Sequence, residues 1–184
     1  MKNNKKHNAK GTLKATSPLD DFSSPNSREN YLLIADSDYL GARTLCLMKL
    51  YFPAGVLAQQ AVEKYLKLKL IEFTTGDKGC ESAREQIFRK CNHNLLSLFQ
   101  ELSPFMKLYN MQLKKELYYK ELLERLTNSF ELKYFDKRGL RGAVYQKGEV
   151  AVGISVSSLP KFDELCMELR NSILSKGTGT TPVN

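Results

Sequence analysis

The sequence predicts an all-α protein, an up-and-down bundle of about five helices. Through most of the region from residue 27 to residue 176, apolar residues recur at steps of three and four, the spacing of one helix face. The stretch 53–71 is apolar around so much of its helical surface that other helices must cover it from two directions. A very short connection precedes this stretch, so the helix before it is expected to run antiparallel and adjacent.

The first helix is expected to begin near Ser27, a residue type that favours the N-cap position, and to end near residue 50. The connection to the second helix is expected at Tyr51, Phe52 and Pro53, with Pro53 at or near the first helical position. The apolar stripe of the first helix consists of Leu32, Ala35, Tyr39, Ala42, Cys46 and Leu50.

The second helix, 53–71, is expected to be the centre of the bundle. Its small alanines allow neighbouring backbones to come close, and Lys69 is the main polar interruption of its apolar surface. The remaining polar residues occupy one narrow arc of the helix: Gln60, Glu63, Lys64 and Lys67.

Two further helical regions follow a loop at 74–79. A short helix is expected at about 82–90, and an amphipathic segment from Leu95 is expected to close at Pro104. One long helix is then predicted from Phe105 to Phe130. Its expected core positions are Leu113, Leu117, Leu123, Leu126 and Phe130.

The last part of the chain changes character twice. Alternating residues near 140–157 predict either a small β-hairpin or an extended loop. Ser158, Leu159 and Pro160 then open a final helix with Phe162, Leu165, Cys166, Leu169 and Ile173 on one face. The expected organisation is a flexible basic tail at 1–26, a helical domain at 27–176 and a flexible tail at 177–184.

Charge, apolar runs and cysteines limit the classes of function and compartment that are expected for this chain. The net charge is +8, but five lysines lie within the first fourteen residues, so the rest of the chain carries only +3 and is not marked as a nucleic-acid binder by charge alone. No apolar run is long enough to span a membrane, and no apolar segment follows the basic start, so we expect neither a membrane span nor a secretory signal. The four scattered cysteines, without a CxxC pair, are typical of reduced thiols and predict a cytoplasmic protein. Cys80, Cys91 and His93 lack the second ligand pair of a zinc site, so we expect no metal, and we expect no cofactor.

Three segments resemble the HEPN family (higher eukaryotes and prokaryotes nucleotide-binding domain). The stretch from Tyr31 to Leu50, which contains Ala-Arg-Thr-Leu at 42–45, looks like the family's first helix. Residues 58–67, Ala-Gln-Gln-Ala-Val-Glu-Lys-Tyr-Leu-Lys, are similar to its Gln-Gln-Ala-x-Glu-Lys-x-x-Lys signature. Residues 93–98, His-Asn-Leu-Leu-Ser-Leu, are similar to its His-x-Leu-x-x-Leu segment. The resemblance covers about residues 28–175.

The resemblance implies a helical bundle that often forms a homodimer across its first helices. The family includes RNases, toxins paired with small nucleotidyltransferases, and domains without demonstrated activity. Its catalytic members carry Arg followed by His after four to six residues, whereas here only three residues separate Arg89 from His93. We therefore expect a non-catalytic domain that binds a nucleotide or RNA, a protein partner such as a nucleotidyltransferase, or both. The alternatives are a metal-independent RNase that uses Arg89 and His93 across a dimer, and a pure protein-interaction bundle.

Three groups of residues are candidate sites. His93 is either a general base beside Arg89, on a shared helix face, or a structural residue that fixes the start of a helix. Glu63, Lys64 and Lys67 either form a structural ion-pair cluster or bind a nucleotide phosphate. The last group combines cationic and stacking side chains, which suit an anionic, base-containing ligand, although a solvated loop has the same composition: Lys133, Lys137, Arg138, Arg141 and Tyr145.

Overall fold

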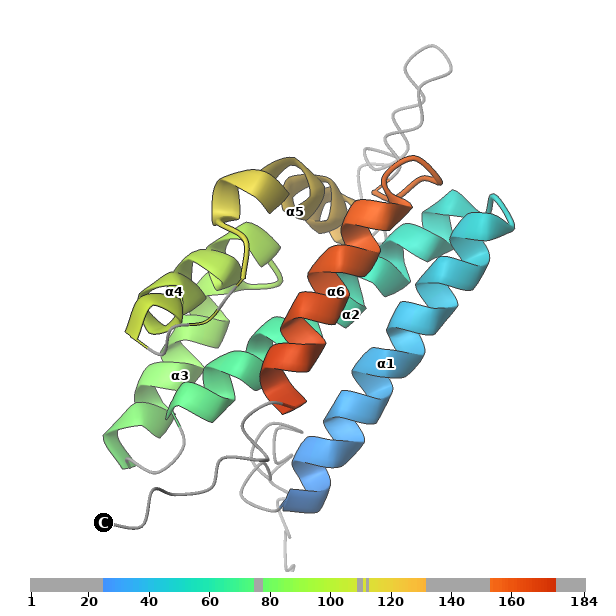
Figure 1. Ribbon diagram of the computed structural model, residues 1–184. Helices are drawn as coiled ribbons and strands as arrows, with labels where there is room; N and C mark the ends of the chain where they lie inside the picture. Colours follow the sequence, from blue (N-terminus) through green and yellow to red (C-terminus); the bar gives the residue numbers. More distant parts are fainter. Residues whose placement is uncertain (1–24, 75–77, 109–110, 112, 132–152, 175–184) are drawn as a thin grey trace, which may run out of the picture.

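The computed structural model describes residues 25–74, 78–108, 111, 113–131 and 153–174, and these residues form six α-helices and no strand. The predicted all-α bundle is therefore confirmed. In Figure 1, α6 runs in front of α2 and α1 lies beside it, while α3 and α4 lie on the other side of the bundle and α5 lies across its top. The helices are α1 (Pro25–Leu47), α2 (Tyr51–Thr74), α3 (Lys78–Cys91), α4 (Leu95–Leu108), α5 (Glu116–Glu131) and α6 (Leu159–Leu174).

A tight turn joins α1 to α2. Lys49 adopts φ 63°. The amide of Leu50 donates to the carbonyl of Leu45, and the amide of Lys49 donates to the carbonyl of Cys46. These are the two hydrogen bonds of a Schellman motif. The turn is therefore Met48–Leu50, and the prediction that Tyr51, Phe52 and Pro53 form the connection is wrong, because they already belong to α2. Leu50 consequently leaves the buried stripe of the first helix and is 47% exposed. The predicted N-cap, Ser27, likewise lies inside α1.

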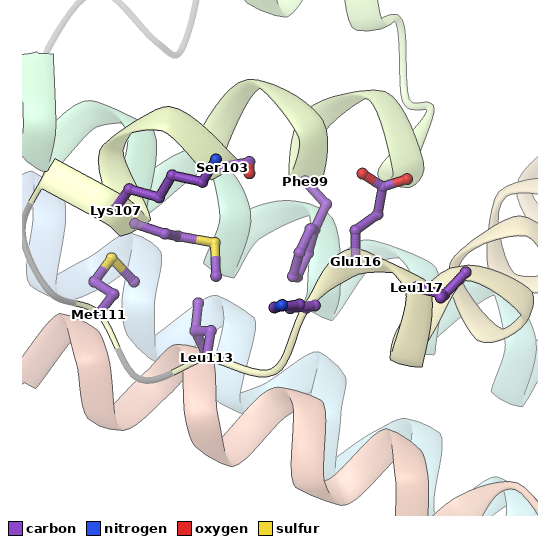
Figure 2. Close-up of a pocket in the computed structure, with 9 residues that line it drawn as sticks. Phe99, Ser103, Lys107, Met111, Leu113, Glu116 and Leu117 are labelled. Carbon is purple, nitrogen blue, oxygen red and sulfur yellow. The ribbon is translucent and has the colours of Figure 1, made fainter.

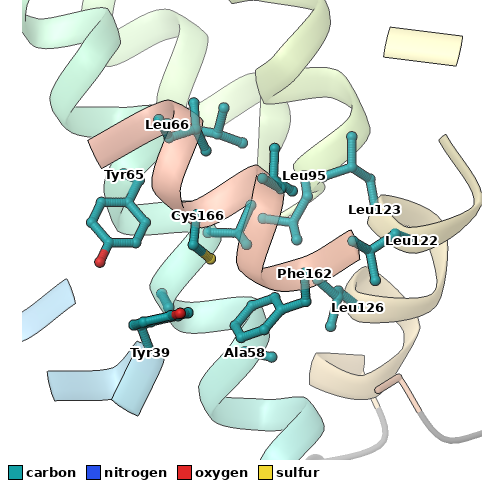
Figure 3. Close-up of a cluster of buried hydrophobic side chains, with 14 of the residues drawn as sticks. Tyr39, Ala58, Tyr65, Leu66, Leu95, Leu122, Leu123, Leu126, Phe162 and Cys166 are labelled. Carbon is teal, nitrogen blue, oxygen red and sulfur yellow. The ribbon is translucent and has the colours of Figure 1, made fainter. Parts of the chain in front are cut away.

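The central position predicted for the second helix is confirmed. Helix α2 packs against all five other helices of the described structure. Its buried side chains include Ala58, Tyr65 and Leu66, which Figure 3 shows within one cluster with residues of α1, α4, α5 and α6. Lys69 is buried as well, and its ammonium donates to Glu72 at 2.6 Å and to the carbonyl of Ser172 in the last turn of α6. A buried cation at a helix C-terminus satisfies carbonyls that have no partner within that helix.

The predicted long helix from Phe105 to Phe130 is two separate helices in the structure. Helix α4 continues through Pro104 to Leu108, and α5 begins only at Glu116. Pro104 is exposed, and the carbonyl that its missing amide would have bonded belongs to Gln100, which also lies on the exposed side of α4. Water can satisfy that carbonyl, so the proline does not close the helix there.

The buried face of α5 differs in part from the predicted one. Leu123 and Leu126 are fully buried as predicted, together with Tyr119 and Leu122. Leu117 is 82% exposed, contrary to its predicted core position. At 100° per residue, the nine residues from Leu117 to Leu126 place their side chains on opposite sides of the helix. Leu113 lies before α5 and is half-buried, and the side chain of Phe130 lies outside the described residues.

The final helix follows the prediction closely. All five expected core residues of α6, Phe162, Leu165, Cys166, Leu169 and Ile173, are buried. Residues 153–158 form a turn that precedes α6, in which the Ser158 hydroxyl accepts from the amide of Ser155 at 2.9 Å. The part of the predicted hairpin that is described, 153–157, therefore contains no strand, and residues 140–152 lie outside the described ranges.

Asp36 of α1 ties three helices together. The guanidinium of Arg170 on α6 donates to both its carboxylate oxygens, Nε to Oδ1 at 2.9 Å and Nη2 to Oδ2 at 3.0 Å. The Tyr65 hydroxyl on α2 donates to the same carboxylate at 2.6 Å. This bidentate ion pair and buried hydroxyl set how α6 sits on the α1–α2 pair.

Candidate functional site

The polar arc of α2 meets the turn between α3 and α4. Glu63 is 7% exposed, and its carboxylate binds three groups, here called the Glu63 cluster with it: Gln59, Lys67 and His93. Lys67 Nζ donates at 2.5 Å and Gln59 Nε2 at 2.7 Å, both from positions one helical turn away on α2. His93 Nδ1 lies 2.9 Å from one carboxylate oxygen and 3.0 Å from the other. The two motif segments at 58–67 and 93–98 therefore meet at a single carboxylate.

Local backbone geometry places the His93 ring against α2. Asn92 and His93 both have positive φ, 38° and 68°, which turns the chain sharply after α3 ends at Cys91. Asn94 then caps α4, since its Oδ1 accepts from the amide of Ser97 at 2.9 Å. The carbonyl of His93 accepts from Gln59 Nε2 at 3.3 Å, so both the ring and the backbone of His93 bind α2.

The electrostatics of the cluster keep Glu63 ionised. Burial alone would raise its pKa, but the nearby charge of Lys67 and the hydrogen bonds from Lys67, His93 and Gln59 outweigh burial and lower the pKa below its ordinary value of 4.5. A carboxylate bound at Nδ1 holds the proton on that nitrogen of the imidazole. Burial, followed by the charges of Glu63 and Asp38, raises the pKa of Tyr31 on α1, so that hydroxyl stays protonated.

Gln59 is the member of the cluster that sequence reasoning did not assign to a site. Its side chain is fully buried, and its Nε2 donates both to the Glu63 carboxylate and to the carbonyl of His93. Its Oε1 has no hydrogen-bond partner among the described residues. The available signal was spacing, because Gln59, Glu63 and Lys67 are four residues apart and must share one helix face.

Arg89 and His93 are not brought together on a helix face. Helix α3 ends at Cys91, so the i, i+4 relationship does not hold across the turn that carries His93. The side chain of Arg89 is 83% exposed and pairs with Glu85 of the same helix at 3.5 Å. The expected shared face for this pair is therefore wrong, for the physical reason that the left-handed backbone of the turn redirects His93 toward α2.

The other predicted site residues divide into two groups. Lys64 points away from the Glu63 cluster and binds Asp38 of α1 at 2.6 Å, so it ties α1 to α2. The basic aromatic group lies outside the described residues: Lys133, Lys137, Arg138, Arg141 and Tyr145.

A row of exposed leucines follows one side of α1. Leu33, Leu40 and Leu47, here called the α1 leucine stripe, are 64%, 58% and 60% exposed. Their spacing of seven residues keeps them on one side of the helix, as in the seam of a coiled coil. Three large apolar side chains exposed at this spacing on one helix are the pattern that a partner helix can cover.

The described residues offer neither a cluster of metal ligands nor a membrane-spanning helix. No three His, Cys, Asp or Glu side chains there are grouped so as to hold a metal ion. None of the helices described is both long and apolar enough to cross a membrane. Comparison of the whole chain with known protein families, curated proteins and solved structures finds no match.

Proposed function

We propose that the chain is a HEPN-like, non-catalytic domain that binds a nucleotide or RNA, a protein partner such as a nucleotidyltransferase, or both, and that it acts as a cytoplasmic homodimer. The observation that carries the proposal is the Glu63–His93 contact. It joins the two motif segments that resemble the family, and it uses the motif histidine to hold the α3–α4 turn against α2. Arg89, the other residue that RNA cleavage would need, lies on the outer surface of α3.

The buried thiols and the α1 leucine stripe support the compartment and the oligomeric state. Cys46, Cys91 and Cys166 are buried free thiols, as expected in a reducing compartment. The α1 leucine stripe is the surface that a second copy would cover. In multi-angle light scattering, we expect a dimer that Leu40→Glu converts to a monomer. Leu117→Glu is the matched control, because Leu117 is even more exposed but lies on α5. A wild-type monomer would refute the homodimer.

Cleavage of labelled RNA by the full-length protein in the presence of a chelator separates binding from catalysis. We expect no cleavage by wild type or by His93→Gln, and a loss of roughly 1 kcal/mol in unfolding free energy for the variant, since one hydrogen bond to a charged, partly exposed pair is removed. Arg89→Gln should leave stability within roughly 0.5 kcal/mol, as for an ordinary surface position. Cleavage that His93→Gln abolishes at unchanged melting temperature would refute the non-catalytic assignment.

The RNase alternative has one observation in its favour. A carboxylate at Nδ1 orients an imidazole so that Nε2 is the nitrogen that accepts a proton, as a general base requires. In this alternative, Arg89 of a second copy would supply the positive charge. The cleavage assay above decides between the two readings, because the binding domain needs no turnover.

Ligand-dependent stabilisation tests the binding function. A ligand that binds only the folded state raises the melting temperature in proportion to the logarithm of its concentration over Kd. We expect ATP or a short RNA to raise the melting temperature, and Arg138→Ala or Arg141→Ala to abolish the rise. No shift with either ligand would leave a pure protein-interaction bundle, and an adjacent nucleotidyltransferase gene would then name the partner to test.

A further inference from the structure

A pocket of about 820 Å³ lies between α4 and Met111 with residues 113–117, here called the returning segment. We call this pocket the hairpin pocket. Figure 2 shows Phe99 entering it from α4 and Leu113 entering it from the returning segment on the opposite side. Its volume is within the range of small-molecule sites, roughly 300–1,000 Å³. None of the residues of the Glu63 cluster lines it, so it is a separate site.

Two hydrogen bonds link the walls of the hairpin pocket. At one end, Gln100 Nε2 donates to Glu116 Oε1 at 3.1 Å and links α4 to the start of α5. At the other end, the amide of Met111 donates to the carbonyl of Met106 at 2.9 Å and turns the chain back. The two walls of the pocket, α4 and the returning segment, are therefore linked to each other by hydrogen bonds.

The returning segment is held in place from below by α6. The backbone amide and the ammonium of Lys114 bind Glu168 and Glu164 respectively, and the Tyr118 hydroxyl donates to Glu164 at 2.8 Å. The Tyr119 hydroxyl donates to Glu168 at 2.8 Å. These contacts fix the wall that carries Leu113 without help from a ligand, so the pocket is preformed.

The lining is apolar and adaptable, and its rim is cationic. Phe99 forms a buried wall, and Met106 and Met111 add flexible thioether side chains that fit apolar ligands of varied shape. Lys107 and Lys115 reach the same pocket, and neither ammonium has an ion-pair partner within the described part of the chain. The single rim carboxylate, Glu116, already accepts from Gln100.

We propose that the hairpin pocket binds a free single-chain amphiphilic carboxylate, a molecule of the fatty-acid class. Its hydrocarbon chain lies against Phe99, Met106 and Leu113, and its carboxylate contacts Lys107 and Lys115. The apolar side chains of the lining suit a hydrocarbon chain, and the two cations favour an anionic head over a neutral one. Leu117, exposed at the edge of the pocket, adds apolar contact for the part of the chain nearest the opening.

Methionine methyl groups report binding in the full-length protein. The chain has five methionines; Met106 and Met111 line the pocket, whereas Met48 and Met167 are exposed on other elements. In spectra of methyl-labelled methionine, monomeric dodecanoate should shift Met106 and Met111 saturably and leave Met48 and Met167 in place. Shortening the chain from dodecanoate to octanoate should weaken binding about twofold to fourfold per methylene. Equal shifts at all four methionines, or none below the micellar concentration, would overturn the proposal.

Variants and a neutral ligand test the recognition of the head group. Lys107→Gln and Lys115→Gln should each weaken dodecanoate binding roughly threefold to tenfold, whereas Lys120→Gln, an exposed lysine on α5, should not. Ser103→Trp fills the pocket from α4 and should abolish the shifts. Dodecanol that binds as tightly as dodecanoate would overturn the role of the lysines. Shifts produced only by anionic phospholipid vesicles, and not by dodecanoate, would overturn the proposal of a free carboxylate as the ligand and would indicate a membrane surface instead.

Discussion

The Asp36 junction makes a quantitative prediction about how α1, α2 and α6 hold together. Replacing Asp36 with alanine removes the acceptor of the Tyr65 hydroxyl, which is fully buried, and leaves that donor without a partner. An unsatisfied buried donor costs about 1–3 kcal/mol. The same substitution removes the partner of Arg170, whose side chain is 36% exposed, so water replaces much of the ion pair and the loss is about 1 kcal/mol or less. We expect Asp36→Ala to lower the unfolding free energy by about 1–4 kcal/mol.

A double-mutant cycle isolates the contribution of the buried hydroxyl. Tyr65→Phe removes the donor itself and should cost about 1 kcal/mol, because the carboxylate keeps Arg170. In the Tyr65→Phe background, Asp36→Ala leaves no buried hydroxyl without an acceptor. It should therefore lower the unfolding free energy only by the contribution of the Asp36–Arg170 ion pair. The two substitutions together should therefore destabilise the protein by about 1–3 kcal/mol less than the sum of their separate effects.

Urea denaturation followed by circular dichroism at neutral pH measures all four corners of this cycle. Asp38→Ala combined with Tyr65→Phe is the matched control, because Asp38 lies on the same helix but binds Lys64 instead. The control pair should be additive within roughly 0.5 kcal/mol. Additivity of the Asp36 pair to the same extent would refute the reasoning that Tyr65 depends on Asp36.

Three further predictions concern other parts of the bundle. The pKa of Glu63 is lowered on folding, so its contribution to stability is complete above about pH 4.5 and is lost as the pH falls through the folded-state pKa. The difference in unfolding free energy between wild type and Glu63→Gln should therefore shrink in acid. A difference that grows in acid would contradict the assignment. An added Cβ at Gly153 would lie 1.8 Å from Ser129 Oγ and 2.8 Å from Ser129 Cβ. Gly153→Ala should therefore destabilise the protein by about 1–3 kcal/mol, and adding Ser129→Ala should restore part of that loss. Full stability of Gly153→Ala in a thermal melt would contradict this packing. Leu117→Gln should change stability by less than about 0.5 kcal/mol, whereas Leu123→Ala should cost about 2–5 kcal/mol; equal effects in denaturant titrations would place both leucines in the core.

Part of the candidate site was visible in the sequence. Glu63 and Lys67 were assigned to one polar arc, and their ion pair exists because residues four apart on a helix always share a face. The partner that completes the arc, His93, lies 30 residues away, and its expected neighbour on a helix was Arg89. That expectation failed because Asn92 and His93 take left-handed backbone conformations, which helical periodicity does not describe.

The sequence alone determined the all-α class, the central place of α2 and the buried face of α6. These properties depend on residues close together along the chain, and a strong helical period, as on α6, reports them directly. Only the tertiary structure decided which distant side chains meet. Arg170 binds Asp36 across 134 residues, and the predicted long helix is divided into α4 and α5, with the hairpin pocket beside α4 and the start of α5. The physical reason is that such contacts depend on how whole helices pack, and local periodicity carries no information about where a helix ends or which neighbour covers it.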